Sequence, residues 1–156
     1  MNDITLKKNF LLFIIFSIIF AVFFLYIKHN VGNDSSVSEW LINYNGGFTR
    51  RGLGGEIAIF IANLFDFSLR QSIFFIQSLF HVSYLVLVFL YLKNLKVNII
   101  QLFAIYAPLF ILYPIAEIEA LGRKEIILFL SFLIALFLCD NKNSKKYINI
   151  YCFFIL

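Results

Sequence analysis

Residues 10–27 read FLLFIIFSIIFAVFFLYI, an 18-residue run in which Ser17 is the only residue that is neither apolar nor aromatic. An uncharged run of this length approaches the roughly 20 residues that an α-helix needs to cross the hydrocarbon core of a bilayer. Lys7 and Lys8 precede it, and no small-residue cleavage site follows it. We therefore expect a retained transmembrane helix here and not a cleaved signal peptide.

The rest of the chain has the same apolar character. Hydrophobic residues make up 62% of the 156 residues and charged residues 14%, whereas a soluble domain is nearer half apolar and a quarter charged. The predicted fold is an all-α, polytopic transmembrane helix bundle in the lipid bilayer. The net charge of +4 comes from cations in short polar gaps between apolar runs, where they set membrane topology. We therefore expect no nucleic-acid partner.

The apolar runs indicate one membrane domain over residues 1–156. A long external loop at 28–70 is expected to contain a short surface helix starting at Ser38, with Trp40 at headgroup depth, and an interfacial or re-entrant helix at 57–67 that is too short to span. The further segments, in chain order, are spans at 72–92, 97–116 and 120–139 and a partial span at 147–156. Because that last run stops after about half a bilayer thickness, we expect an N-terminal fragment of a longer protein.

The distribution of lysine and arginine indicates an orientation. With a cytoplasmic N-terminus, every cation on the inner side is a lysine and all four arginines lie outside. Lys7 and Lys8 before the first span, against Lys28 after it, favour the same orientation. We expect a multi-pass protein of the bacterial inner (plasma) membrane with two charged clusters on its external face.

The first charged cluster covers residues 39–56, EWLINYNGGFTRRGLGGE. Its glycines allow the backbone to approach a ligand closely, and the paired side chains of Arg50 and Arg51 suit bidentate binding of a phosphate. The alternative is that the glycines only shape a turn while the arginines meet lipid headgroups.

The second charged cluster covers residues 117–125, EIEALGRKE. Charges near a membrane helix are costly, so they pair with one another or serve a function. In the functional interpretation Glu117 or Glu119 is a catalytic base or metal ligand, and Arg123 and Lys124 hold an anion. In the structural interpretation the same residues neutralise each other and anchor a hairpin. We assign no metal and no cofactor.

One histidine, His81, lies inside the second predicted span. No second metal-ligating residue stands three or four positions away. We therefore expect a hydrogen bond that packs helices together.

The two motifs WLINYNGGFTRRGLGGE and GRKE together resemble uncharacterised bacterial polytopic proteins of surface-polysaccharide synthesis. More loosely, the layout is similar to O-antigen-type polymerases and to membrane glycosyltransferases that use polyprenyl-linked donors. The resemblance implies transfer of polyprenyl-phosphate-linked sugars at the external membrane face. In the polymerases external arginines hold the sugar pyrophosphate, and Arg50, Arg51 and Arg123 match them. In the glycosyltransferases an acidic pair in the first external loop is catalytic. The nearest match here, Glu117 and Glu119, lies in the second external loop.

Two other functions remain open from the sequence. A transporter or flippase element is suggested by the short re-entrant segment and by a helix broken near Pro114. A non-catalytic, truncated partner of other membrane subunits is suggested by the abrupt end of the last apolar run.

Overall fold

The computed structural model describes residues 4–31, 35–47, 52–93, 103, 105–107, 112–117 and 120–140. These residues contain helices and turns and no strand, which confirms the predicted all-α class. The helices are α1 (Ile4–Val31), α2 (Ser35–Trp40), α3 (Leu53–Phe65), α4 (Leu69–Leu92), α6 (Tyr113–Ala116) and α7 (Glu125–Asp140). Several predicted features lie outside the described residues: Arg50, Arg51, Glu119, most of the span 97–116, and the partial span 147–156.

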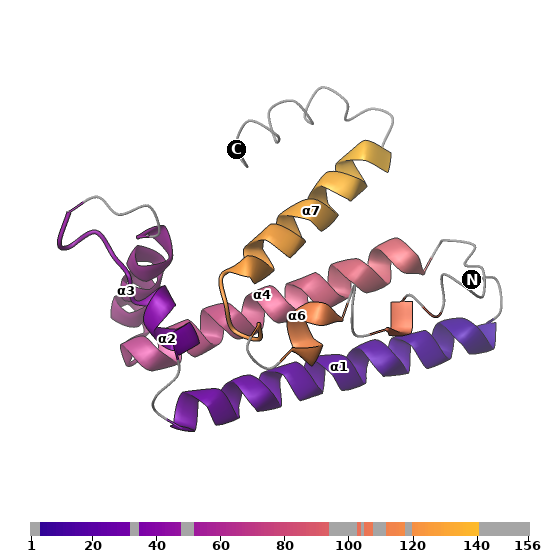
Figure 1. Cartoon of the computed structure of the whole chain (residues 1–156), viewed down its shortest axis with the longest axis horizontal. Coiled ribbons are helices and arrows are strands. Elements are labelled where there is room, and N and C mark those ends of the chain that lie inside the picture. Colours follow the sequence, from indigo (N-terminus) through magenta and orange to yellow (C-terminus); the bar gives the residue numbers. More distant parts are fainter. Residues whose placement is uncertain are drawn as a thin grey trace.

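Helices α1 and α4 run antiparallel along each other and form the long axis of the fold (Figure 1). The buried residues of α1 recur every three or four positions, which is the spacing of one helix face. They are Phe10, Ile14, Ser17, Ala21, Leu25 and His29. Helix α7 packs against α4, so that these three helices share most of one apolar core.

Two described helical segments are long and apolar enough to cross a membrane: Lys7–Val31 of α1, and α4. They contain the predicted spans 10–27 and 72–92. The face of α1 that points away from α4 is also apolar. Its outward residues Leu12, Phe16, Ile19 and Phe23 are each between 56% and 67% exposed.

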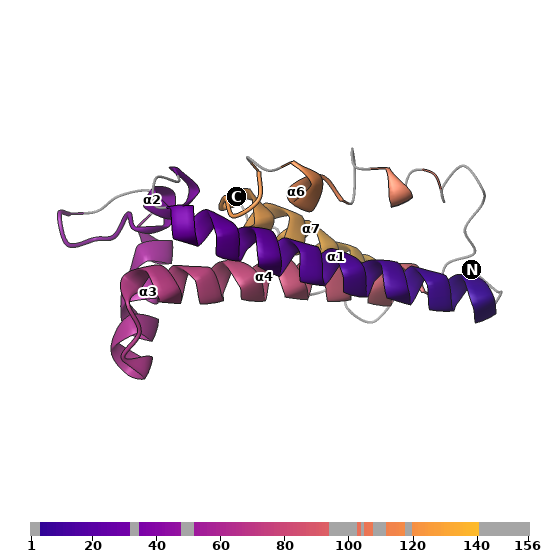
Figure 2. The same cartoon turned by 90° about the horizontal axis from the view of Figure 1, so that it is seen from below.

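Helices α2 and α3 gather at one end of the α1–α4 pair, where α1 ends and α4 begins, and α3 lies across the axis of α4 (Figure 2). Helix α3 ends at Phe65, and the capping residue Asp66 adopts a left-handed backbone with φ of 53°. Ser68 then starts α4 with a capping box: its hydroxyl accepts from the Gln71 amide, and the Gln71 side chain accepts from the Ser68 amide. This capping box satisfies two backbone amides at the start of α4.

The region around Trp40 differs from the prediction. The short helix ends at Trp40, whereas a helix starting at Ser38 was expected. The Trp40 side chain is only 1% exposed and packs on α4 near Phe80, with a ring-centroid distance of 5.9 Å. It is therefore buried in protein, because the fold supplies both an apolar wall and a hydrogen-bond acceptor for the indole.

The predicted span 120–139 is also longer than the helix observed. Helix α7 begins at Glu125, and residues 120–124 form a turn that we name the tip turn. Gly122 adopts φ of 90° there, a conformation that is costly for residues with a side chain. Pro114 was expected to kink or end a helix, yet it stands in the first turn of α6, where its missing amide hydrogen has no helical partner to lose.

Candidate functional site

Three side chains from three different helices hold the backbone of the tip turn. Trp40 Nε1 and Gln77 Nε2 both donate to the Gly122 carbonyl oxygen, each at 2.7 Å. Lys28 Nζ donates to the Leu121 carbonyl oxygen, also at 2.7 Å. Because these donors come from α1, α2 and α4, the tip turn is fixed to the end of the bundle where α2 and α3 gather.

Gln77 is the centre of this network. It is 1% exposed, and its Oε1 lies 2.7 Å from Nε2 of His29 on α1. His81 Nδ1 lies 2.8 Å from the Gln77 backbone oxygen. This hydrogen bond of His81 lies within α4, and a polar link between α1 and α4 is made by His29 and Gln77.

The network brings the two charged clusters together. Lys124 Nζ lies 5.8 Å from the centre of the Trp40 ring, a cation–π arrangement. A Cβ built on Gly54 would lie 3.4 Å from Lys124 Cε. Residues of the first cluster thus contact residues of the second, although more than 60 positions separate them in the sequence.

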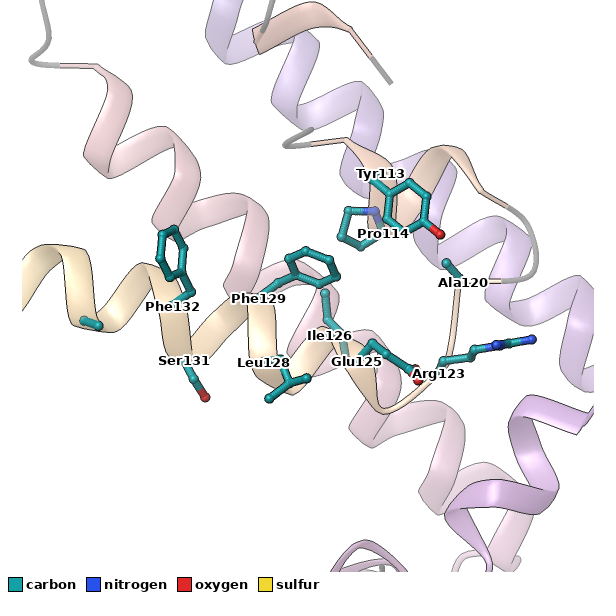
Figure 3. Close-up of a pocket in the computed structure, with 11 residues that line it drawn as sticks. Tyr113, Pro114, Ala120, Arg123, Glu125, Ile126, Leu128, Phe129, Ser131 and Phe132 are labelled. Carbon is teal, nitrogen blue, oxygen red and sulfur yellow. The ribbon is translucent and has the colours of Figure 1, made fainter. Parts of the chain in front are cut away.

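Arg123 lies at one end of a groove between α6 and α7, which we name the α6–α7 groove. Its volume is about 620 Å³ and its lining is mostly apolar. Figure 3 shows Tyr113 and Pro114 on one side of the groove and Phe129 and Phe132 on the other, with Arg123 in the tip turn and its side chain directed away from Phe129 and Phe132. The lining suits an apolar chain, and Arg123 is the arginine in the turn at one end of the groove.

Lys124 lies at a second groove, between α3 and α7, which we name the α3–α7 groove. Its volume is about 370 Å³. Ile57, Phe80 and Leu128 belong to its apolar wall, and its charged side chains are Glu39, Lys124 and Glu125. Glu125 and Leu128 line both grooves, so the two grooves meet at the first turn of α7.

Of the predicted catalytic carboxylates, Glu119 lies outside the described residues, and the Glu117 backbone oxygen accepts a hydrogen bond from the Leu121 amide of the tip turn at 3.0 Å. Glu117 ends α6 with an extended backbone, is exposed, and lines neither groove. Glu56 of the first cluster has a structural contact: its Oε1 accepts from the Tyr44 amide at 2.9 Å. Among the described residues no group of three or more metal-ligating side chains occurs.

Comparisons with protein-family models, with curated proteins and with solved structures found no match.

Replacing Gln77 by leucine is expected to lower the free energy of unfolding by about 1–3 kcal/mol, the usual cost of leaving buried polar partners unsatisfied. The change removes the donor to Gly122 and the partner of His29 Nε2. Titration of the purified protein with SDS in mixed micelles would measure it. Asn63→Leu, on the exposed face of α3, is the matched control. Equal stability of the two variants would contradict the role given to Gln77.

Proposed function

We propose that this protein is a multi-pass membrane protein with a cytoplasmic N-terminus. The two long apolar helices support this, and so does the exposed apolar stripe along α1. A continuous apolar stripe of this kind is a liability in water, but it matches lipid. With this orientation the tip turn, α2 and α3 face the outside of the inner membrane.

We further propose that the α6–α7 groove binds the lipid part of a polyprenyl-phosphate-linked sugar, with its phosphate at Arg123. The observation that carries this proposal is the combination of a mostly apolar groove of about 620 Å³ with an arginine, Arg123, in the turn at its end. An isoprenoid phosphate has the same division into an apolar chain and an anionic head. Arginine suits phosphate because its planar group donates two parallel hydrogen bonds.

The proposed reaction is sugar transfer, in which the chain acts as part of a polymerase or glycosyltransferase. An acceptor hydroxyl oxygen attacks the anomeric carbon of the donor, and the bond from that carbon to the phosphate oxygen breaks. The electron pair leaves on the phosphate, where Arg123 stabilises the added negative charge. A carboxylate accepts the hydroxyl proton, and Glu117 and Glu119 are the sequence candidates for this role.

Replacing Arg123 by alanine is expected to weaken binding of an isoprenoid phosphate by about 10- to 100-fold, because hydrogen bonds to charged groups contribute about 1.5–3 kcal/mol. The measurement uses protein in lipid nanodiscs and geranylgeranyl phosphate that carries a photoactivatable diazirine on its chain. Labelled residues are mapped by mass spectrometry. We expect labels on α6–α7 groove residues such as Phe129 and Phe132.

Arg70→Ala is the matched control, because Arg70 lies at the same end of the fold and lines neither groove. It should label like the unchanged protein. Equal labelling of Arg123→Ala and Arg70→Ala would overturn the proposed site, and so would labels confined to the outer face of α1.

A further inference from the structure

The α3–α7 groove differs from the α6–α7 groove in its charges. Its charged side chains are two carboxylates, Glu39 and Glu125, and one ammonium, Lys124, which lies over the Trp40 ring. The α6–α7 groove has one guanidinium and one carboxylate. An anionic headgroup in the α3–α7 groove would meet two like charges, whereas in the α6–α7 groove it meets one.

Two carboxylates and one ammonium do suit a neutral headgroup that is rich in hydroxyls. The carboxylates accept hydrogen bonds from hydroxyl groups, and the ammonium donates them. The wall below them is apolar, with Ile57, Ile76 and Phe80 along it. This combination fits an uncharged sugar that is attached to an apolar chain.

We propose that the α3–α7 groove binds the neutral sugar of an acceptor glycolipid, with Glu39, Lys124 and Glu125 around its hydroxyl groups. This inference rests on the proposed function and names the class and position of its second substrate. The geometric reason for pairing the two sites is that Glu125 is a lining residue of both grooves. A hydroxyl held by Glu125 therefore lies beside the groove that holds the donor.

Glu39 provides the first test because it lines only the α3–α7 groove. The probe is octyl glucoside carrying a diazirine on its alkyl chain, added to protein in nanodiscs that contain no glycoside detergent. Glu39→Gln is expected to lower labelling of the α3–α7 groove about threefold or more, because an amide is a weaker acceptor than a carboxylate. Labelling by the isoprenoid phosphate probe should not change. Asp66→Asn, outside both grooves, is the control.

Glu125 provides a second test, in which one substitution is expected to affect labelling by the two probes differently. Glu125→Gln removes an acceptor from the sugar and a like charge from the phosphate. We expect weaker labelling by the octyl glucoside probe and unchanged or stronger labelling by the isoprenoid phosphate probe. A general loss of structure would weaken both, so the divergence separates binding from folding.

Two results would overturn the inference. One uses diazirine-bearing octanol, which has the alkyl chain of the glucoside probe and lacks the sugar. The inference fails if this probe labels the α3–α7 groove as strongly as the glucoside probe does, in both the unchanged protein and Glu39→Gln. The other is preferential labelling of this groove by the isoprenoid phosphate probe. Neither would bear on Arg123, whose own variant decides the proposed donor site.

Discussion

Replacing Trp40 by alanine is expected to lower the free energy of unfolding by about 3–5 kcal/mol, as for other large-to-small changes of buried aromatic residues. The indole is 1% exposed and belongs to a buried cluster with Val37, Ala58 and Ile73. The change also removes the donor at 2.7 Å from the Gly122 carbonyl oxygen. SDS titration in mixed micelles, followed by helical circular dichroism, would measure the loss.

Trp40→Phe divides this effect into its parts. Phenylalanine keeps most of the ring contacts and lacks the N–H group, so we expect a loss of about 1–3 kcal/mol from the hydrogen bond. Leu64→Ala, at a residue that is 61% exposed on α3, is the control for truncating a surface hydrophobic residue. Should Trp40→Ala unfold no more easily than Leu64→Ala, the indole would not be the anchor of the tip turn.

The long helices were predictable from the sequence because their signal is local. The apolar run at 10–27 and the predominantly apolar run at 72–92 specify long helices through composition and length alone. The short apolar segment at 57–67 likewise corresponds to α3, shifted toward its N-terminus. Helix ends were less predictable: α7 starts five residues later than expected, because positive φ at Gly122 ends the preceding turn.

The network that holds the tip turn was not predictable because its contacts are distant in the sequence. Trp40 and Gly122 are 82 positions apart, and Lys28 and Leu121 are 93 apart. A lone tryptophan in a polar loop is typical of a membrane interface, and only the folded chain reveals its buried acceptor. Gln77 did carry a readable signal, since a polar side chain inside a predicted span needs a partner.

The sequence predicted which charged residues belong to the candidate site, but not which groove each of them lines. From the sequence, Arg123 and Lys124 were predicted to form one anion-binding pair. In the fold they line two different grooves, Arg123 the α6–α7 groove and Lys124 the α3–α7 groove. Glu125 is the last residue of the second charged cluster and was given no role from the sequence. In the fold it is the carboxylate residue that lines both grooves. The side chains of adjacent residues in a turn point in different directions, and a sequence motif does not indicate those directions.

Replacing Gly55 by alanine is expected to destabilise the protein by about 1–3 kcal/mol in spite of the better helix propensity of alanine. Gly55 is buried in the first turn of α3, where a Cβ would collide with the backbone carbonyl of Ile42. A backbone carbonyl cannot rotate aside as a side chain can, so the 41–47 segment or α3 itself must move. Overpacking of this kind costs more than the roughly 1 kcal/mol that alanine gains over glycine in a helix.

Replacing the neighbouring Gly54 by alanine is expected to change the stability in the opposite direction, or not at all. A Cβ on Gly54 meets Lys124 Cε and Trp40 Cε3 at 3.4 Å, an ordinary contact, so Gly54→Ala should be neutral or stabilise α3 by up to about 1 kcal/mol. Gly46→Ala, with nothing within 4 Å of the new Cβ, controls for a change in the adjoining loop. Opposite shifts of the SDS midpoint for Gly54→Ala and Gly55→Ala would show that α3 is held against the Ile42 backbone at its first turn. Stabilisation by both changes would mean that helix propensity alone governs both positions, and that the first cluster is not anchored by this close approach.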